Sequence, residues 1–221
     1  MEKNSRKKCI DRLQEEVSQF LLHSKLVLKG VVIMPKEIEV YYYKKGEFED
    51  ESVHQNELQT QKHKNHFYVH RKGTKQTDSY KGGNRTCLDF VVSDDPNTYY
   101  SFLIRSAIIG GEHIVGPNKV LKKIKEVCNL DNEGLERMLV NVVSNNTDYD
   151  VLFSNRINLT KGFVDYKLRA VLCDENFKDS KYLYKEKLVL DYISRHDLLQ
   201  NQAEKYAKEK LGYLPSSIKQ L

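Results

Sequence analysis

The sequence predicts an α+β fold: a single domain with a curved, largely antiparallel sheet and helices packed around its edges. Stretches in which apolar and polar residues alternate, as strands do, follow one another through much of the chain. The segments with helical spacing do not alternate regularly with these strands, as they would in a parallel α/β protein. A chain of 221 residues is long enough for one sizeable core, so we expect one domain.

The first elements are a helix and two strands. Helical spacing of apolar residues predicts a helix over residues 11–24, and an apolar, β-branched run predicts a strand over 26–34. Pro35 is expected to turn the chain into a second strand, residues 35–43. In that strand apolar residues alternate with polar ones, which puts Glu39 and Tyr41 on the same face. By itself, this pattern also fits the charged outer face of an edge strand.

The remaining elements follow from the same periodicities and from turn residues. Residues 44–65 are polar and irregular, and 73–84 form a basic, turn-rich loop. We expect strands at residues 66–71, 86–92, 99–109, 150–159 and 164–172. Pro117 opens a helix that runs to residue 128, and further helices are expected at 135–143 and 200–211. Residues 183–194 fit either a helix or a strand followed by a helix.

We therefore divide the chain into three parts: an N-terminal helix at residues 1–25, an α+β core at 26–172, and a C-terminal extension at 173–221 that packs on the same domain. No apolar run approaches the roughly 18 residues that a membrane helix needs, so no membrane association is expected. The charged start of the chain is unlike a secretory signal. Four cysteines lie far apart without a Cys-x-x-Cys pair, which favours reduced thiols in a cytoplasmic protein.

The net charge of +5 is modest, but it is unevenly distributed. Between Thr60 and Arg85 there are seven basic residues and one acid, Asp78, with Tyr68 and Tyr80 interleaved. Basic residues mixed with aromatic rings suit a phosphate backbone and exposed bases. A solvated surface loop has the same composition. The candidates for contacts with such a nucleic acid are Lys62, Lys64, Arg71, Lys72, Lys75, Tyr80, Lys81 and Arg85.

Several catalytic classes lack their motifs in this sequence. The phosphate-binding Gly-x-x-x-x-Gly-Lys loop, the dinucleotide-binding Gly-x-Gly-x-x-Gly and the Gly-x-Ser-x-Gly elbow do not occur. His66 and His70 would lie about 13–14 Å apart along a strand, too far to share one ion, so no metal is expected. After these exclusions, the remaining candidate is a site built on a carboxylate with aromatic rings, histidine and arginine around it. Such a site suits a reaction in which a positioned water attacks an electron-poor carbon.

The order of short motifs resembles the alkyladenine (3-methyladenine) DNA glycosylase family. The matching segments are Glu-Ile-Glu-Val-Tyr41, Ser-Val-His54, Tyr-Val-His70, Phe-Leu-Ile-Arg-Ser-Ala107, Val-Gly-Pro-Asn-Lys-Val-Leu121 and Asn-Arg-Ile-Asn-Leu159, spread over about residues 26 to 172. The family carries Glu-Thr-Glu-Ala-Tyr, Ser/Ala-His, Tyr-Val-Tyr, Val-Leu-Ile-Arg-Ala, Gly-Pro-x-Lys-Leu and Arg-Ile-Gly in this order. Because each motif is short, the resemblance rests on the order and spacing of the motifs along the chain.

The resemblance implies roles for five residues. Glu39 matches the glutamate that orients and deprotonates the attacking water, and Arg105 matches an arginine near that water and the sugar-phosphate. Tyr41 and His54 match residues that line the pocket for the flipped-out base, and His70 stands where the family has a stacking tyrosine.

Departures from the family accompany these matches, and residues 58–67 also stand where the family has Thr-Pro-Arg and Met-Phe. His70 replaces a tyrosine, and Asp89 stands where the family has an asparagine. The bulky residue that enters the duplex has no clear match, although Tyr80 is a candidate by its location. Such changes would suit altered substrate choice or loss of activity.

The resemblance implies a monofunctional DNA glycosylase that excises alkylated or damaged purines in base-excision repair, with Glu39 activating water for attack at C1′ of a flipped nucleotide. The implied partner is double-stranded DNA containing damaged purines, and we expect a monomer without metal or organic cofactor. Two alternatives stay open: an inactive relative that binds damaged DNA, and a protein-interaction domain that uses the basic loop.

Overall fold

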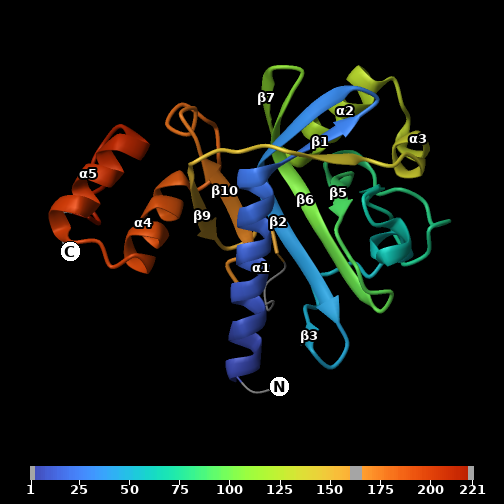
Figure 1. Ribbon diagram of the computed structural model, residues 1–221, viewed down its shortest axis with the longest axis horizontal. Coiled ribbons are helices and arrows are strands. Elements are labelled where there is room, and N and C mark those ends of the chain that lie inside the picture. The colour runs from blue at the N-terminus through green and yellow to red at the C-terminus, as the bar shows by residue number, and fades with distance from the viewer. Residues whose placement is uncertain (1–2, 160–165, 219–221) are drawn as a thin grey trace.

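Two long antiparallel strands, β2 (Val31–Lys44) and β6 (Thr98–Ile109), form the centre of the sheet. The computed structural model describes residues 3–159 and 166–218 (Figure 1). Ile33 of β2 lies opposite Ile109, and Lys44 lies opposite Thr98, so the two strands pair along almost their whole length. The register shifts on either side of Glu37, which marks a β-bulge.

The other strands extend this pair into a sheet that curls into a half-barrel. The order along the sheet is β4-β5-β6-β2-β1-β8, while β10 also pairs with β2, β9 pairs with β10, β3 with β2 and β7 with β6. Every strand pair within the described residues is antiparallel, which confirms the predicted fold class. These strands are β1 (Ser24–Leu28), β3 (Phe48–Glu49), β4 (Phe67–Val69), β5 (Leu88–Val91), β7 (Glu112–Val115), β8 (Asn141–Ser144), β9 (Asp150–Ser154) and β10 (Arg169–Cys173).

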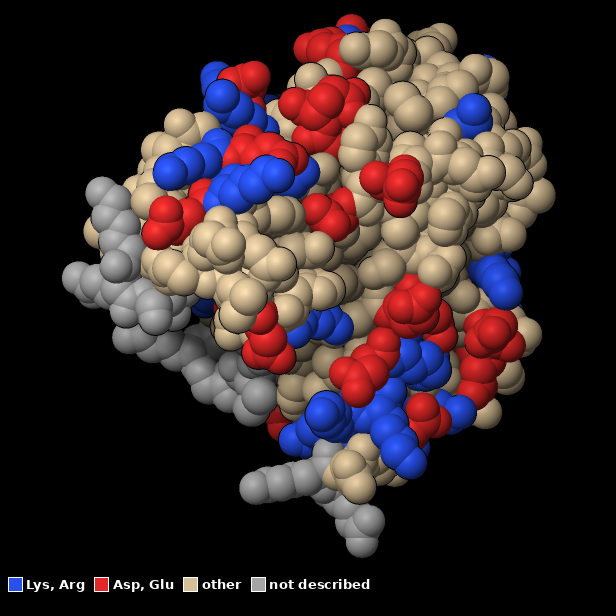
Figure 2. Space-filling view, turned by 60° about the vertical axis from the view of Figure 1, so that its left-hand side comes forward, with Lys and Arg blue, Asp and Glu red and all other residues tan. Residues whose placement is uncertain are grey.

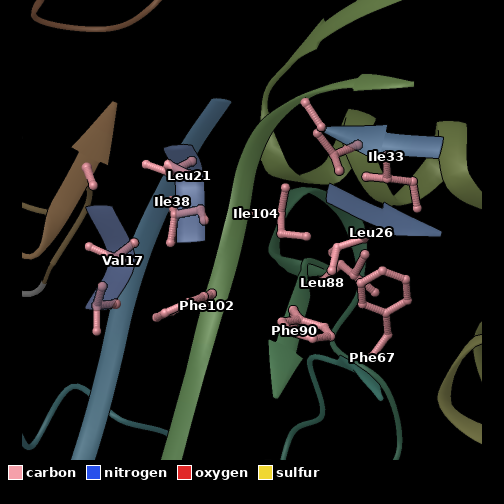
Figure 3. Close-up of a cluster of buried hydrophobic side chains, with 14 of the residues drawn as sticks. Val17, Leu21, Leu26, Ile33, Ile38, Phe67, Leu88, Phe90, Phe102 and Ile104 are labelled. Atoms are coloured by element: carbon pink, nitrogen blue, oxygen red, sulfur yellow. The ribbon is translucent and has the colours of Figure 1, made fainter. Parts of the chain in front are cut away.

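The main core lies on one face of this sheet. Alternation along β2 sends Ile38 and Val40 into that core, and Phe102 and Ile104 of β6 join them (Figure 3). The first helix, α1 (Lys3–His23), covers this face with a stripe of fully or almost fully buried side chains: Leu13, Val17 and Leu21. The opposite face of β2 and β6 carries Glu37, Glu39, Tyr41, Leu103 and Arg105.

Helices gather beside the ends of the sheet (Figure 1). The first of them, α2 (Pro117–Cys128), buries Val120, Leu121 and Ile124, as its helical spacing predicts. The short α3 (Asn132–Arg137) is capped at its N-terminus by Asp131, whose side chain accepts a hydrogen bond from the Gly134 N–H. In the C-terminal region, α4 (Lys185–Arg195) and α5 (Gln200–Leu211) pack with β9 and β10 in a second apolar cluster.

Three sequence predictions need correction. Pro35 does not end a strand but lies inside β2. The single strand expected over 26–34 is divided: Lys29 and Gly30, both at positive φ, make the turn between β1 and β2. Residues 135–143 are not one helix, because α3 ends at Arg137 and β8 then pairs with β1.

Other predictions are sharpened. The ambiguous segment 183–194 is helical from Lys185, and the strand expected over 150–159 ends at Ser154. The strand expected over 164–172 is found at Arg169–Cys173, while residues 160–165, including the start of that expected strand, lie outside the described residues. Within the described ranges, no helix combines the length and apolar character required to cross a membrane.

Candidate active site

A cleft of about 630 Å³ opens on the face of β2 and β6 that is opposite the main core. Four of the five residues singled out as catalytic or base-binding line it: Glu39, Tyr41, His70 and Arg105. Strand pairing explains why they meet. Glu39 lies opposite Leu103 in the β2–β6 ladder, and Tyr41 lies opposite Ser101, so their side chains share one face with Arg105. We call this hollow the Glu39 cleft.

Three donors hold the Glu39 carboxylate at the cleft floor. The Ile157 backbone N–H donates to Oε1 at 2.6 Å, and the Arg105 Nη1 and the Tyr41 hydroxyl donate to Oε2 at 3.3 and 3.2 Å. Glu39 is fully buried, and burial raises its pKa, while Arg105 and the Ile157 N–H act in the opposite direction. A carboxylate with a raised pKa that is held in one orientation is suited to take a proton from water.

Arg105 is itself held between two carboxylates. Its Nε lies 3.3 Å from Glu37 Oε1, and Arg169 Nε donates to the same oxygen at 2.7 Å. Arg169 is fully buried, and its Nη2 donates to the Leu183 carbonyl at 2.9 Å. This chain of contacts links the cleft floor to the segment that precedes α4.

A second buried arginine supports Tyr41. The Arg156 guanidinium carbon lies 4.9 Å from the centre of the Tyr41 ring. Its Nη1 pairs with Asp50 at 2.7 Å and donates to the Val40 carbonyl at 3.1 Å. The loop before Thr160 thus contributes both this cation and the Ile157 N–H to the β2 strand.

His70 lies on the wall of the cleft and is fixed on two sides. Its Nε2 lies 2.7 Å from Asp89 Oδ1, and since a carboxylate only accepts, the nitrogen donates. One face of its ring stacks on buried Tyr68, with ring centres 5.5 Å apart.

His54 is the one predicted base-binding residue that does not line the cleft. It is partly buried behind Tyr68, whose hydroxyl lies 2.8 Å from the His54 Nδ1. Burial lowers its pKa, and the charge of Lys81 adds to this effect. His54 therefore contacts His70 through Tyr68 rather than facing the hollow.

The predicted DNA-contacting residues separate into three groups. Lys81 and Arg85 line the Glu39 cleft, while Lys62, Lys64, Lys72 and Lys75 are exposed at other positions of the segment. Arg71 is buried, forms an ion pair with Glu136 and lies against the Tyr80 ring. The Tyr80 hydroxyl donates to Glu136 as well. Arg71 and Tyr80 thus bind each other and Glu136 in this structure.

Two basic residues of α2 were not among the residues predicted from the sequence. Lys119 and Lys122 are exposed and line the same cleft as Lys81 and Arg85. Asn118 joins the two segments, because its Nδ2 donates to the Gly83 and Thr86 carbonyls at 3.1 and 2.9 Å. The only signal for these lysines was their three-residue spacing on the exposed side of an amphipathic helix. Figure 2 shows one face of the molecule, on which Lys and Arg side chains are interspersed with Asp and Glu.

No protein-family model matches this sequence, and the search of curated proteins found no match. Among residues 3–159 and 166–218, no three His, Cys, Asp or Glu side chains are grouped so that they could hold a metal ion.

Proposed function

We propose that this protein is a monofunctional DNA glycosylase that removes alkylated purines from double-stranded DNA. The observation that carries the proposal is the Glu39 carboxylate, which is buried, fixed by three donors and located at the floor of a cleft with a ring on its wall and cations at its rim. A volume of about 630 Å³ is within the usual range for a site that encloses a small organic group.

In the proposed reaction, Glu39 accepts a proton from a water molecule as the water oxygen forms a bond to C1′ of the flipped nucleotide. The bond between C1′ and the base nitrogen breaks, and its electron pair leaves with the base. A purine alkylated at N3 or N7 carries a positive charge in the nucleotide, so it leaves as a neutral molecule. Arg105 keeps the carboxylate in place and opposes the effect of burial on its pKa.

The rim of the cleft is suited to the phosphates that flank such a nucleotide. Lys81 and Arg85 approach from the basic loop, and Lys119 and Lys122 approach from α2. The first turn of α2 also lines the cleft, and the N-terminal end of a helix attracts anions. Contacts of this kind make affinity fall as salt concentration rises.

One chain contains every residue that the mechanism uses, and we propose that it acts as a monomer. In this proposal residues 26–172 carry the chemistry, and the extension 173–221 supports it through the contact between Arg169 and Leu183. All four cysteines are free and buried, which fits a reducing compartment, and we propose a cytoplasmic location.

The test is the release of bases from DNA treated with a methylating agent. Wild-type protein should release methylated purines, and Glu39→Gln should bind the same DNA while its rate falls by about 10²–10⁴, the usual contribution of a general base. Asp174→Asn is a matched control, because Asp174 is another buried carboxylate with a cationic partner, Lys36 at 2.8 Å, outside the cleft.

Other results of these measurements would argue against the mechanism or favour a different function. Normal release by Glu39→Gln would refute the mechanism. Tight, salt-dependent binding to damaged DNA without release by the wild type would favour a non-catalytic binding protein. Absence of DNA affinity at low salt would favour a protein-interaction domain.

A further inference from the structure

A second buried carboxylate, Glu37, precedes Glu39 on the same face of β2, and the mechanism above gives it no role. Glu37 does not line the Glu39 cleft. It lines a neighbouring cavity of about 690 Å³, which is bounded by β7 and by the segment before α4. Arg105 lines both cavities and so forms part of the wall between them. Glu37 can therefore act on the cleft only through its charge and through Arg105.

The irregular pairing of β2 with β6 explains why Arg105 meets both carboxylates. The residues on either side of Arg105 lie opposite Glu37 and Ile38, so Arg105 itself is left without a partner in the register. An extra residue of this kind in a ladder has its side chain re-aimed. The Arg105 carbonyl accepts a hydrogen bond from the Gly116 N–H at 2.8 Å, which fixes the backbone at this point.

The contacts of Arg105 divide its charge between the two carboxylates. Its Nε lies 3.3 Å from Glu37 Oε1, and its Nη1 donates to Glu39 Oε2 at 3.3 Å. A guanidinium that faced Glu39 alone could offer two parallel N–H groups, which bind a carboxylate more strongly than one does. The position of Glu37 leaves Glu39 with a hydrogen bond from one nitrogen.

Glu37 is fixed on its other side by Arg169. All three guanidinium nitrogens of Arg169 donate: Nε to Glu37 Oε1 at 2.7 Å, Nη1 to the Ser154 hydroxyl at 3.1 Å and Nη2 to the Leu183 carbonyl at 2.9 Å. Arg169 is fully buried and Glu37 is only 3% exposed, so neither side chain can turn toward water. The Glu37 carboxylate is therefore held beside Arg105.

We propose that Glu37 is a positioning residue for the reaction described above: by holding one side of Arg105, it prevents the arginine from neutralising Glu39 completely. The Glu39 carboxylate then stays basic enough to take a proton from water. This inference rests on the proposed function and adds a residue to it. Glu37 does not touch the substrate in this scheme and acts through Arg105.

The charges around Glu39 agree with this role. Burial is the main cause of its raised pKa; Arg105 and the Ile157 N–H lower the pKa, and the charge of Glu37 raises it again. Glu37 thus opposes the effect of the arginine that it holds. The charged and titratable groups around Glu39 are Glu37, Tyr41, Arg105, Arg156 and His70, with the basic residues of the rim beyond them.

The test is the pH profile of base release by Glu37→Gln, which keeps the shape of the side chain and removes its charge. Arg105 can then bind Glu39 alone, so the acidic limb of kcat/KM should move to lower pH by about one unit. The rate on the plateau should fall, because a less basic carboxylate is a weaker general base. Arg169→Gln removes a cation from the other side of Glu37, so it should move the limb in the opposite direction.

Asp174→Asn is again the matched control, since it removes the charge of a buried carboxylate outside the cleft and should leave the limb unchanged. If Glu37→Gln does not fold because Arg169 loses its anion, the double variant Glu37→Gln/Arg169→Gln removes both charges and should still move the limb to lower pH. A lower rate with an unchanged limb in a folded variant would show a merely structural role and overturn the inference, as would a shift of Glu37→Gln to higher pH.

Failure of the proposed function has a different signature. If the wild type releases no base, the glycosylase proposal fails, but the pKa of Glu39 can still be measured by NMR of isotope-labelled glutamate carboxylates. The Glu39 signal is the one that Glu39→Gln lacks. A lower pKa of Glu39 in Glu37→Gln than in the wild type would support the role of Glu37, and equal values would overturn it.

Discussion

Replacing Asp50 by alanine removes the carboxylate that pairs with Arg156 beside Tyr41. The two side chains are 2% and 0% exposed, and their charged atoms lie 2.7 Å apart. Arg156 would keep its charge in a site from which water is excluded. The substitution therefore tests how much of the fold depends on compensating the buried charges around the candidate site.

The expected loss is large. Removing one partner of a buried ion pair costs about 3–5 kcal/mol of unfolding free energy, because the remaining buried charge loses much of its compensation. For a chain of this size, each kcal/mol corresponds to about 2–4 °C, so Asp50→Ala should lower the Tm by about 6–20 °C in a thermal melt. Adding Arg156→Met to Asp50→Ala should recover part of that loss, since it removes the second buried charge of the pair as well.

The matched control is the exposed pair between Arg137 and Glu133. Its atoms lie 2.8 Å apart, but the side chains are 77% and 60% exposed. Arg137→Ala should cost about 1 kcal/mol or less, because water screens the pair. If Asp50→Ala and Arg137→Ala lower the Tm equally, burial does not determine the value of these pairs, and the reasoning is wrong.

Three further predictions concern the proposed activity and the entry to α2. Burial raises the pKa of Glu39, and Glu39 must be ionised to act. As the pH is lowered, kcat/KM should therefore begin to fall at a pH above about 4.3, the pKa of free glutamate. Arg105→Met should move this acidic limb of the pH profile to higher pH, and an acidic limb near the ordinary glutamate pKa in the wild type would contradict the prediction. Lys119→Ala should weaken binding to all DNA sequences and reduce the slope of log Kd against log salt by about 1, whereas Lys205→Ala on α5 should change neither. Gly116 has φ 114°, and an added Cβ would meet Lys119 only at 3.8 Å; Gly116→Ala should therefore cost about 1–3 kcal/mol through backbone strain alone, as measured by urea unfolding.

The sequence predicted the face of β2 correctly because burial enforces a two-residue period. Ile38 and Val40 could be assigned to the core, and Glu39 and Tyr41 then had to share the other face. The position of Pro35 could not be predicted in this way. On one side of β2, β1 pairs with residues 31–33 and β10 pairs with residues 37–39, which leaves Pro35 between two partners. On that side no ladder hydrogen bond to residue 35 is lost, and the strand continues with Pro35 opposite Ala107 of β6.

Pairing between distant segments explains the other differences. Residues 141–144 form β8 because β1 offers an edge for pairing more than a hundred positions earlier in the chain. For the site, side-chain motifs identified Glu39, Tyr41, His70 and Arg105. His54 follows the same motif pattern, but Tyr68 stands between it and the cleft. The bond between His70 and Asp89 could not be read from either residue alone.

The Ile157 N–H that donates to Glu39 belongs to the main chain, and this has a consequence for how the site can change over evolutionary time. Any amino acid except proline supplies the same donor at this position. Residue 157 can therefore drift within the limits of its packing while the carboxylate keeps its orientation. An anchor of this kind leaves no trace in residue identity, so the geometry of the site can outlast the resemblance between sequences that share it.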